Sequence, residues 1–134
     1  MPTRPPLRSG AIGVLVVEDE PLLMMDTADI FTASGMDAFE ARDADAALKI
    51  LSGRGDISVL ITDLAMPLGT MDGRSLIRVV AERWPHIGML VLSGSDTPKH
   101  GDLPLDVRFL PKPCRGRDLV SAVFALLSRQ TGGI

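Results

Sequence analysis

Five short apolar runs alternate along the chain with longer segments in which apolar residues recur at helical spacing. The runs are continuously apolar, as expected for strands covered by helices on both faces. Because parallel strands need long crossover connections, the alternation predicts an α/β fold with a five-stranded parallel sheet. The predicted strands are Ala11–Val17, Ala38–Ala41, Ser58–Thr62, Gly88–Leu92 and Val107–Leu110.

Capping and breaking residues place helices between these strands. Pro21 suits the first turn of a helix that stops near Gly35, and Asp43 is a plausible N-cap for the next helix. The Trp84-Pro85 pair closes a third helix, since a residue before proline avoids the α region. The last helix is expected to present one apolar face, made of Leu119, Val120, Val123, Phe124 and Leu127.

The composition is that of one ordinary globular domain. The chain has 134 residues, of which 46% are hydrophobic and 23% charged, and its net charge of −3 argues against direct nucleic-acid binding. Cys114 is the single cysteine, and no apolar run is long enough to span a bilayer. We therefore predict a cytoplasmic protein that does not bind membranes, with a disordered lead-in at 1–10, one domain at 11–130 and a tail at 131–134. If the chain is complete, no output domain is attached.

Chemically active residues follow the predicted strands. Because the carboxyl ends of parallel strands share one edge of the sheet, these residues should converge there. Three carboxylates in one place repel each other unless a cation neutralises them, and a hard divalent ion such as Mg²⁺ suits oxygen ligands. The residues in question are Glu18, Asp19, Asp63, Ser93 and Lys112.

This set suits phosphoryl transfer, in which positioning and charge stabilisation supply most of the catalysis. Asp63 could attack as the nucleophile. The metal ion, Lys112 and Ser93 would each hold one oxygen of the transferred group.

At these positions the chain resembles the receiver domains of bacterial two-component systems, over roughly Gly13 to Leu127. Each motif is weak alone, but their order along the chain is specific. The matching segments are Leu15-Val16-Val17-Glu18-Asp19-Glu20, Leu60 to Pro67, Met71-Asp72-Gly73, Leu92-Ser93-Gly94 and Phe109-Leu110-Pro111-Lys112-Pro113.

The resemblance implies a flavodoxin-like three-layer sandwich with strand order 2-1-3-4-5 and about five helices. It implies that Asp63 is phosphorylated in a Mg²⁺-dependent reaction, with Ser93 and Phe109 as switch residues and Lys112 on the phosphoryl group. The implied Mg²⁺ ligands are Glu18, Asp19, Asp63 and the backbone carbonyl of Ala65. The implied donor is a sensor histidine kinase or a phosphotransfer protein. The downstream protein is unknown, and a weak homodimer is left open.

Three departures from the family pattern stand out. Glu18 stands where aspartate is commoner, which suggests a contact with the metal through water. Leu68-Gly69-Thr70 lengthens the loop that borders the site. The segment Ser95–Asp106 is short and interrupted by proline and glycine, so the fourth helix should be short or irregular, as in a subgroup of receivers common in alphaproteobacteria.

The main alternative is a pseudo-receiver, the same fold used as a protein-docking module without phosphorylation. The presence of Asp19, Asp63 and Lys112 argues against it. An aspartate-nucleophile phosphatase is disfavoured because a second acid is expected where Ala65 stands. A flavin protein is disfavoured because Glu18-Asp19-Glu20 would repel its phosphate.

Overall fold

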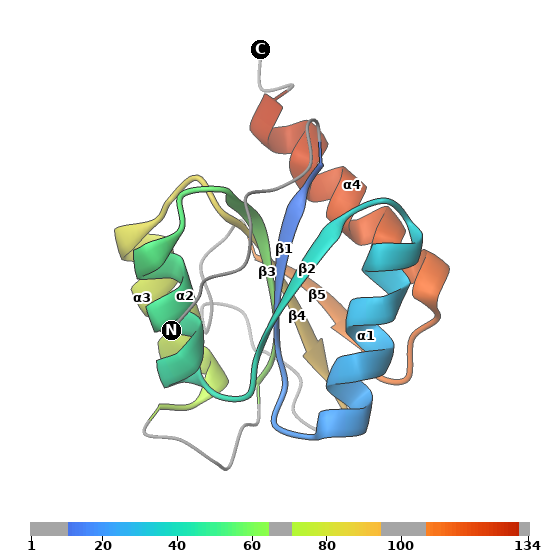
Figure 1. Ribbon diagram of the computed structural model, residues 1–134, viewed down its shortest axis with the longest axis horizontal. Helices are drawn as coiled ribbons and strands as arrows, with labels where there is room; N and C mark the ends of the chain where they lie inside the picture. Colours follow the sequence, from blue (N-terminus) through green and yellow to red (C-terminus); the bar gives the residue numbers. More distant parts are fainter. Residues whose placement is uncertain (1–10, 65–70, 95–106, 132–134) are drawn as a thin grey trace.

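The computed structural model describes residues 11–64, 71–94 and 107–131. Five parallel strands form one sheet in the order β2-β1-β3-β4-β5, and the four helices of the described residues flank it (Figure 1). This confirms the predicted fold class and strand order. In chain order the elements are β1 (Gly13–Val17), α1 (Pro21–Ala33), β2 (Asp37–Ala41), α2 (Ala44–Gly53), β3 (Ile57–Asp63), α3 (Gly73–Arg83), β4 (Gly88–Ser93), β5 (Arg108–Pro111) and α4 (Gly116–Thr131).

The sheet has two buried faces, each covered by two helices (Figure 1). Successive side chains of a strand point to opposite faces. In β1, Val14 and Val16 therefore join one core with α1 and α4, while Leu15 and Val17 join the other with α2 and α3. This burial on both sides explains why the strands are continuously apolar in the sequence.

Side-chain carboxylates cap three of the helices at their amino ends. Glu20 accepts a hydrogen bond of 2.8 Å from the backbone N–H of Leu23 in α1. Asp43 and Asp72 act in the same way on α2 and α3. These caps satisfy backbone donors that no helical carbonyl can reach. Beyond the carboxyl end of α1, Gly35 has a φ of 87°, a left-handed conformation that favours glycine.

The predicted face of the last helix is wrong at one residue. Phe124 is 48% exposed, although the sequence pattern places it among the inward-facing residues of α4. The buried residues of α4 instead recur at intervals of three and four, which leaves Phe124 outside the buried face. The buried residues are Leu119, Ala122, Val123 and Leu126.

Several predictions concern segments outside the described residues. The short or irregular fourth helix is predicted in Ser95–Asp106, and the longer loop at Leu68–Thr70; both lie there. So do the lead-in at 1–10 and the end of the tail, at 132–134. Across the ranges that are described, every helix is too short or too polar to cross a membrane.

Candidate functional site

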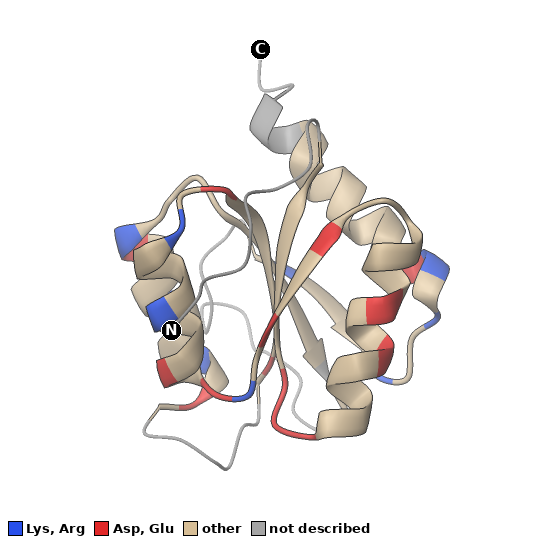
Figure 2. Cartoon of the chain, viewed as in Figure 1, with Lys and Arg blue, Asp and Glu red and all other residues tan. Residues whose placement is uncertain are grey.

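The carboxyl ends of three strands bring charged side chains together. Glu18 follows β1, Asp63 ends β3 and Lys112 follows β5. Figure 2 shows acidic residues where β1 leads into α1, at this edge of the sheet. The convergence predicted from the strand ends is therefore confirmed for these three residues.

Lys112 lies between the two carboxylates. Its Nζ donates a hydrogen bond to Oδ2 of Asp63 at 2.5 Å and lies 3.6 Å from Oε2 of Glu18. The side chains of Lys112, Asp63 and Glu18 are 28%, 14% and 10% exposed. One ammonium thus faces two largely buried carboxylates, and Coulomb interactions in such a place are stronger than in water.

Glu18 is fixed by its backbone neighbours. Its N–H donates to the carbonyl of Ala41 at 3.0 Å, and its Oε1 accepts from the N–H of Glu20 at 3.2 Å. Burial raises the pKa of the Glu18 carboxyl, and contacts with Asp19 and Asp63 act in the same direction. Lys112 and the Glu20 N–H lower the pKa without offsetting the increase. Glu18 therefore holds its negative charge at a cost, which a nearby cation would reduce.

Lys112 experiences the opposite balance. Burial lowers the pKa of its ammonium group, but the hydrogen bond with Asp63 and the charges of Glu18 and Asp63 outweigh burial. The net shift is upward, so Lys112 stays charged at neutral pH. It can therefore pair with an anion that reaches the site.

The backbone around Asp63 is held on several sides. Thr62 is fully buried, and its Oγ1 donates to the carbonyl of Asp63 at 3.1 Å. The N–H of Leu64 donates to the carbonyl of Leu92 at 3.3 Å, so pairing with β4 extends past the end of β3. The N–H of Gly73 donates to the carbonyl of Leu64 at 3.1 Å and ties the start of α3 to the same turn.

The remaining predicted site residues are placed less completely. Asp19 is half-buried next to Glu18. Ser93 ends β4, where its backbone pairs with Pro111 of β5. Phe109 pairs with Val91 and packs against the core on the α2 and α3 side. Ala65 lies outside the described residues.

Sequence reasoning missed one contact at this site. Gly73 begins α3 directly against the backbone of Asp63 and Leu64. The Met71-Asp72-Gly73 segment matches the family pattern, but the match gives no indication that the glycine touches the end of β3. Glu20, the third acid after β1, is used as the cap of α1, with its carboxylate on the N–H of Leu23.

The oxygen donors at this edge fit a hard divalent cation. Among the residues that the structure describes, no three side chains of the metal-binding types gather into a complete metal site. Mg²⁺ does not need such a cage, because it commonly keeps several waters and takes one or two carboxylates. The carboxylates of Glu18 and Asp63, which both lie near the Lys112 ammonium, suit that mode.

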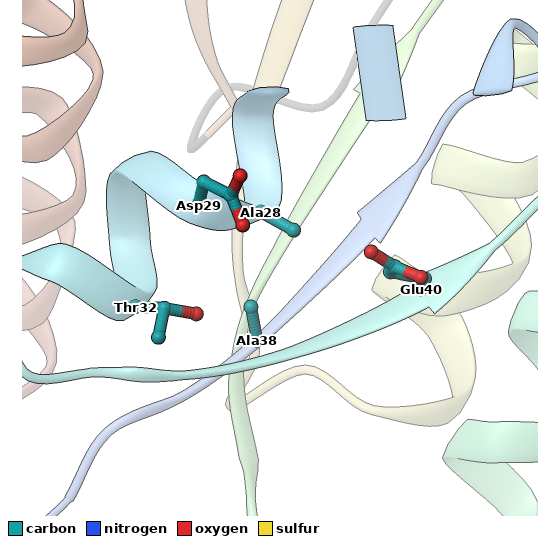
Figure 3. Close-up of a pocket in the computed structure, with 5 residues that line it drawn as sticks. All are labelled: Ala28, Asp29, Thr32, Ala38 and Glu40. Carbon is teal, nitrogen blue, oxygen red and sulfur yellow. The ribbon is translucent and has the colours of Figure 1, made fainter. Parts of the chain in front are cut away.

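A separate hollow of about 470 Å³ opens between α1 and β2 (Figure 3). It contains none of the predicted site residues, and its two carboxylates, Asp29 and Glu40, are exposed. The strand-end set is therefore the stronger candidate site. The hollow is lined by Ala28, Asp29, Thr32, Ala38 and Glu40.

Comparison with known proteins gives a consistent result. The family model of the response regulator receiver domain matches residues 14–124. The receiver domain of the hybrid histidine kinase CckA is 31% identical, with a TM-score of 0.72, and the match covers 86% of this chain and 98% of that one. A response regulator receiver protein from Sinorhizobium medicae has the same fold, with a TM-score of 0.83 at 24% identity, covering 92% and 99% of the two chains.

A curated relative, the nitrogen assimilation regulatory protein NtrX of Azorhizobium caulinodans, is 28% identical over 115 residues. The match covers 80% of this chain but only 24% of the relative, so the likeness concerns one part of a longer protein. The family match includes residues of all five strands and both partners of the Lys112–Asp63 ion pair. The chain therefore belongs to the response regulator receiver domains of two-component systems.

Proposed function

We propose that this receiver domain accepts a phosphoryl group on Asp63 in a Mg²⁺-dependent reaction, with a histidine kinase or a histidine phosphotransfer protein as the donor. Receiver domains are signalling phosphoacceptors and generally not enzymes, and they interact with donors of this kind. The observation that carries the proposal is the contact of Lys112 with Asp63 and Glu18, which joins three strand ends.

The transfer would proceed by attack of an Asp63 carboxylate oxygen on the phosphorus of a phosphohistidine. The new P–O bond forms as the P–N bond breaks, and the histidine nitrogen leaves with the electron pair of that bond and takes up a proton. Lys112 now donates to Asp63, and in the reaction it would pair with an oxygen of the incoming group. Ser93, at the end of β4, is proposed to donate to another oxygen.

A bound Mg²⁺ would supply neutralisation of the charge that accumulates on the phosphoryl oxygens. Asp63, Asp19, Glu18 and the carbonyl of Ala65 are the proposed ligands, with Glu18 acting through water. Support comes from burial of Glu18, which makes its negative charge unfavourable without a positive neighbour.

Phosphorylation would then act on a partner. We propose that Ser93 and Phe109 respond to the phosphoryl group and alter a binding surface, or that the domain serves as a phosphate sink in a relay. That it works in the cytoplasm, as one domain at 11–130, is also a proposal. The longer relative shows that receivers with this likeness occur in larger proteins.

Intact-mass spectrometry after incubation with acetyl phosphate tests the central proposal. The wild-type protein should gain one phosphoryl group with Mg²⁺ and none with EDTA, because Mg²⁺ is proposed to neutralise the charge that accumulates on the phosphoryl oxygens. Asp63→Asn should gain none under either condition. A matched control is Asp56→Asn, at the opposite end of β3, which should behave as the wild type.

Two outcomes would contradict the proposal. Uptake at another residue in Asp63→Asn would move the site. A folded wild-type protein that takes up no phosphoryl group from acetyl phosphate or from a phosphorylated histidine phosphotransfer protein would favour the pseudo-receiver docking module.

A further inference from the structure

The first residue of α3 lies unusually close to the backbone that carries Asp63. A Cβ atom placed on Gly73 would lie 2.2 Å from the carbonyl oxygen of Asp63. It would also lie 2.8 Å from both Cα and the carbonyl oxygen of Leu64. All three atoms belong to the main chain, so no side-chain rotation can relieve the contact. Any side chain at this position must move either the start of α3 or the end of β3.

The lack of room for a side chain, rather than a special backbone conformation, explains why Gly73 is a glycine. Gly35 is the glycine with a positive φ among the described residues, so Gly73 does not need the left-handed region. Glycine is also a poorer helix former than alanine, so it does not stabilise α3. A Cβ atom placed on Gly53 or Gly55, in contrast, would have no such neighbour within 4 Å.

The contact is linked to the carboxylate through a short series of bonds. The Asp63 carbonyl that Gly73 approaches also accepts the hydrogen bond of Thr62. The N–H of Gly73 donates to Leu64, whose own N–H donates to Leu92 of β4. A shift of the Gly73 backbone would therefore move the main chain of Asp63. It would also move the Asp63 carboxylate, which accepts the hydrogen bond from Lys112.

We propose that Gly73 is a positioning residue for phosphoryl acceptance: its missing side chain lets α3 press on the Asp63–Leu64 backbone and sets where the Asp63 carboxylate lies. This inference rests on the proposed function of Asp63. Group transfer is sensitive to position, and a misplacement of about 1 Å can cost about a hundredfold in rate.

The test compares Gly73→Ala with the matched control Gly53→Ala. Both substitutions add one methyl group at a glycine in a helix, but only the first meets main-chain atoms. Phosphoryl uptake from acetyl phosphate is measured by intact mass over a series of Mg²⁺ concentrations and expressed per folded molecule from circular dichroism. Gly73→Ala should slow uptake by about tenfold or more and raise the half-saturating Mg²⁺ concentration. Gly53→Ala should match the wild type in both.

A merely structural role predicts a different result, namely a lower melting temperature with unchanged uptake per folded molecule; that result would overturn the proposal. If Gly73→Ala is largely unfolded, the same measurement is made in trimethylamine N-oxide, which strengthens burial. Failure of the wild type itself to take up phosphoryl groups would instead contradict the proposed function, so the two failures are distinguishable.

Discussion

The two ends of the sheet differ in how their charged side chains are paired. At the amino end of β3, Arg54 forms a two-point ion pair with Asp56, with both N–O distances at 2.9 Å. Its guanidinium also lies 4.2 Å from the centre of the Phe39 ring. At the carboxyl end, one ammonium, that of Lys112, serves both Asp63 and Glu18.

The two sets differ in the number of carboxylates and in how far apart their residues lie along the sequence. Arg54 and Asp56 are two residues apart and match in charge, so one loop contains a complete pair. Lys112 and Asp63 are 49 residues apart, and Glu18 adds a second carboxylate. A local ion pair stabilises a loop, whereas ionisable side chains from distant strands that meet and have shifted pKa values are typical of a functional site.

Removal of the ammonium should have the largest effect on the carboxyl end. Lys112→Ala is expected to slow phosphoryl uptake by about a hundredfold, as loss of one donor to a developing charge commonly does. It should also tighten Mg²⁺ binding, because a positive competitor leaves Asp63 and Glu18. Uptake is measured by intact mass, and Mg²⁺ binding by titration calorimetry.

Lys49→Ala, which removes an exposed lysine from α2, is the control and should change neither quantity. If Lys112→Ala weakened Mg²⁺ binding instead, the view of Lys112 as a competitor of the cation would be wrong.

Removal of the cation at the amino end should affect stability alone. Arg54→Ala loses the paired hydrogen bonds to Asp56 and the stacking on Phe39, together worth about 1–3 kcal/mol of unfolding free energy. Urea unfolding measures the loss, and the double variant with Asp56→Asn isolates the ion pair. Slower phosphoryl uptake per folded Arg54→Ala molecule would break the contrast between the two ends.

The sheet could be predicted because its signals are local. Runs such as Leu15–Val17 are continuously apolar, and Pro21, Asp43 and Trp84 mark helix boundaries by their own chemistry. The strand-end rule then placed Glu18, Asp63 and Lys112 at one edge, since parallel strands must end together.

Contacts that depend on packing could not be read in this way. Phe124 directly follows buried Val123 in the sequence. The rotation of α4 about its own axis against the sheet decides which of these two side chains is exposed. Gly73 looks like an ordinary residue of a turn, and its approach to Asp63 depends on how α3 docks. Glu20 belongs to an acidic run, yet its carboxylate caps α1.

The cap of α3 offers a smaller test that joins stability to the carboxyl end. Asp72→Ala should cost about 1 kcal/mol of unfolding free energy, through loss of the hydrogen bond from the Ser75 N–H. That hydrogen bond lowers the pKa of Asp72 below 3.8, so its contribution is present above that pH. The contribution disappears as the pH falls through the lowered value, and the two proteins should converge in acid.

Asp43→Ala is the matched control, because Asp43 caps α2 by the same contact with Ala46. Both variants should lose similar stability in urea unfolding, but only Asp72→Ala loosens the helix whose first residue bonds Leu64. A modest decrease in phosphoryl uptake is therefore expected for Asp72→Ala alone. Equal phosphoryl uptake by the two variants would mean that the Asp72 cap does not influence the site around Asp63.

The smallest expected effect on stability comes from substitution of Glu18, and whether the free energy of unfolding rises or falls is informative. Because burial raises the pKa of this carboxyl above 4.5, the folded state binds a proton more tightly than the unfolded chain does. That preference stabilises the fold fully below pH 4.5 and is lost as the pH rises through the folded-state pKa.

Glu18→Gln, which is neutral at every pH, should therefore be slightly more stable than the wild type near neutral pH without Mg²⁺. The advantage should vanish in acid, and saturating Mg²⁺ should reduce it by stabilising only the wild-type charge. Urea unfolding at several pH values, with and without Mg²⁺, measures both trends. A Glu18→Gln variant less stable than the wild type at neutral pH would mean that Lys112 fully compensates both carboxylates, and the contrast between the two ends of the sheet would then be lost.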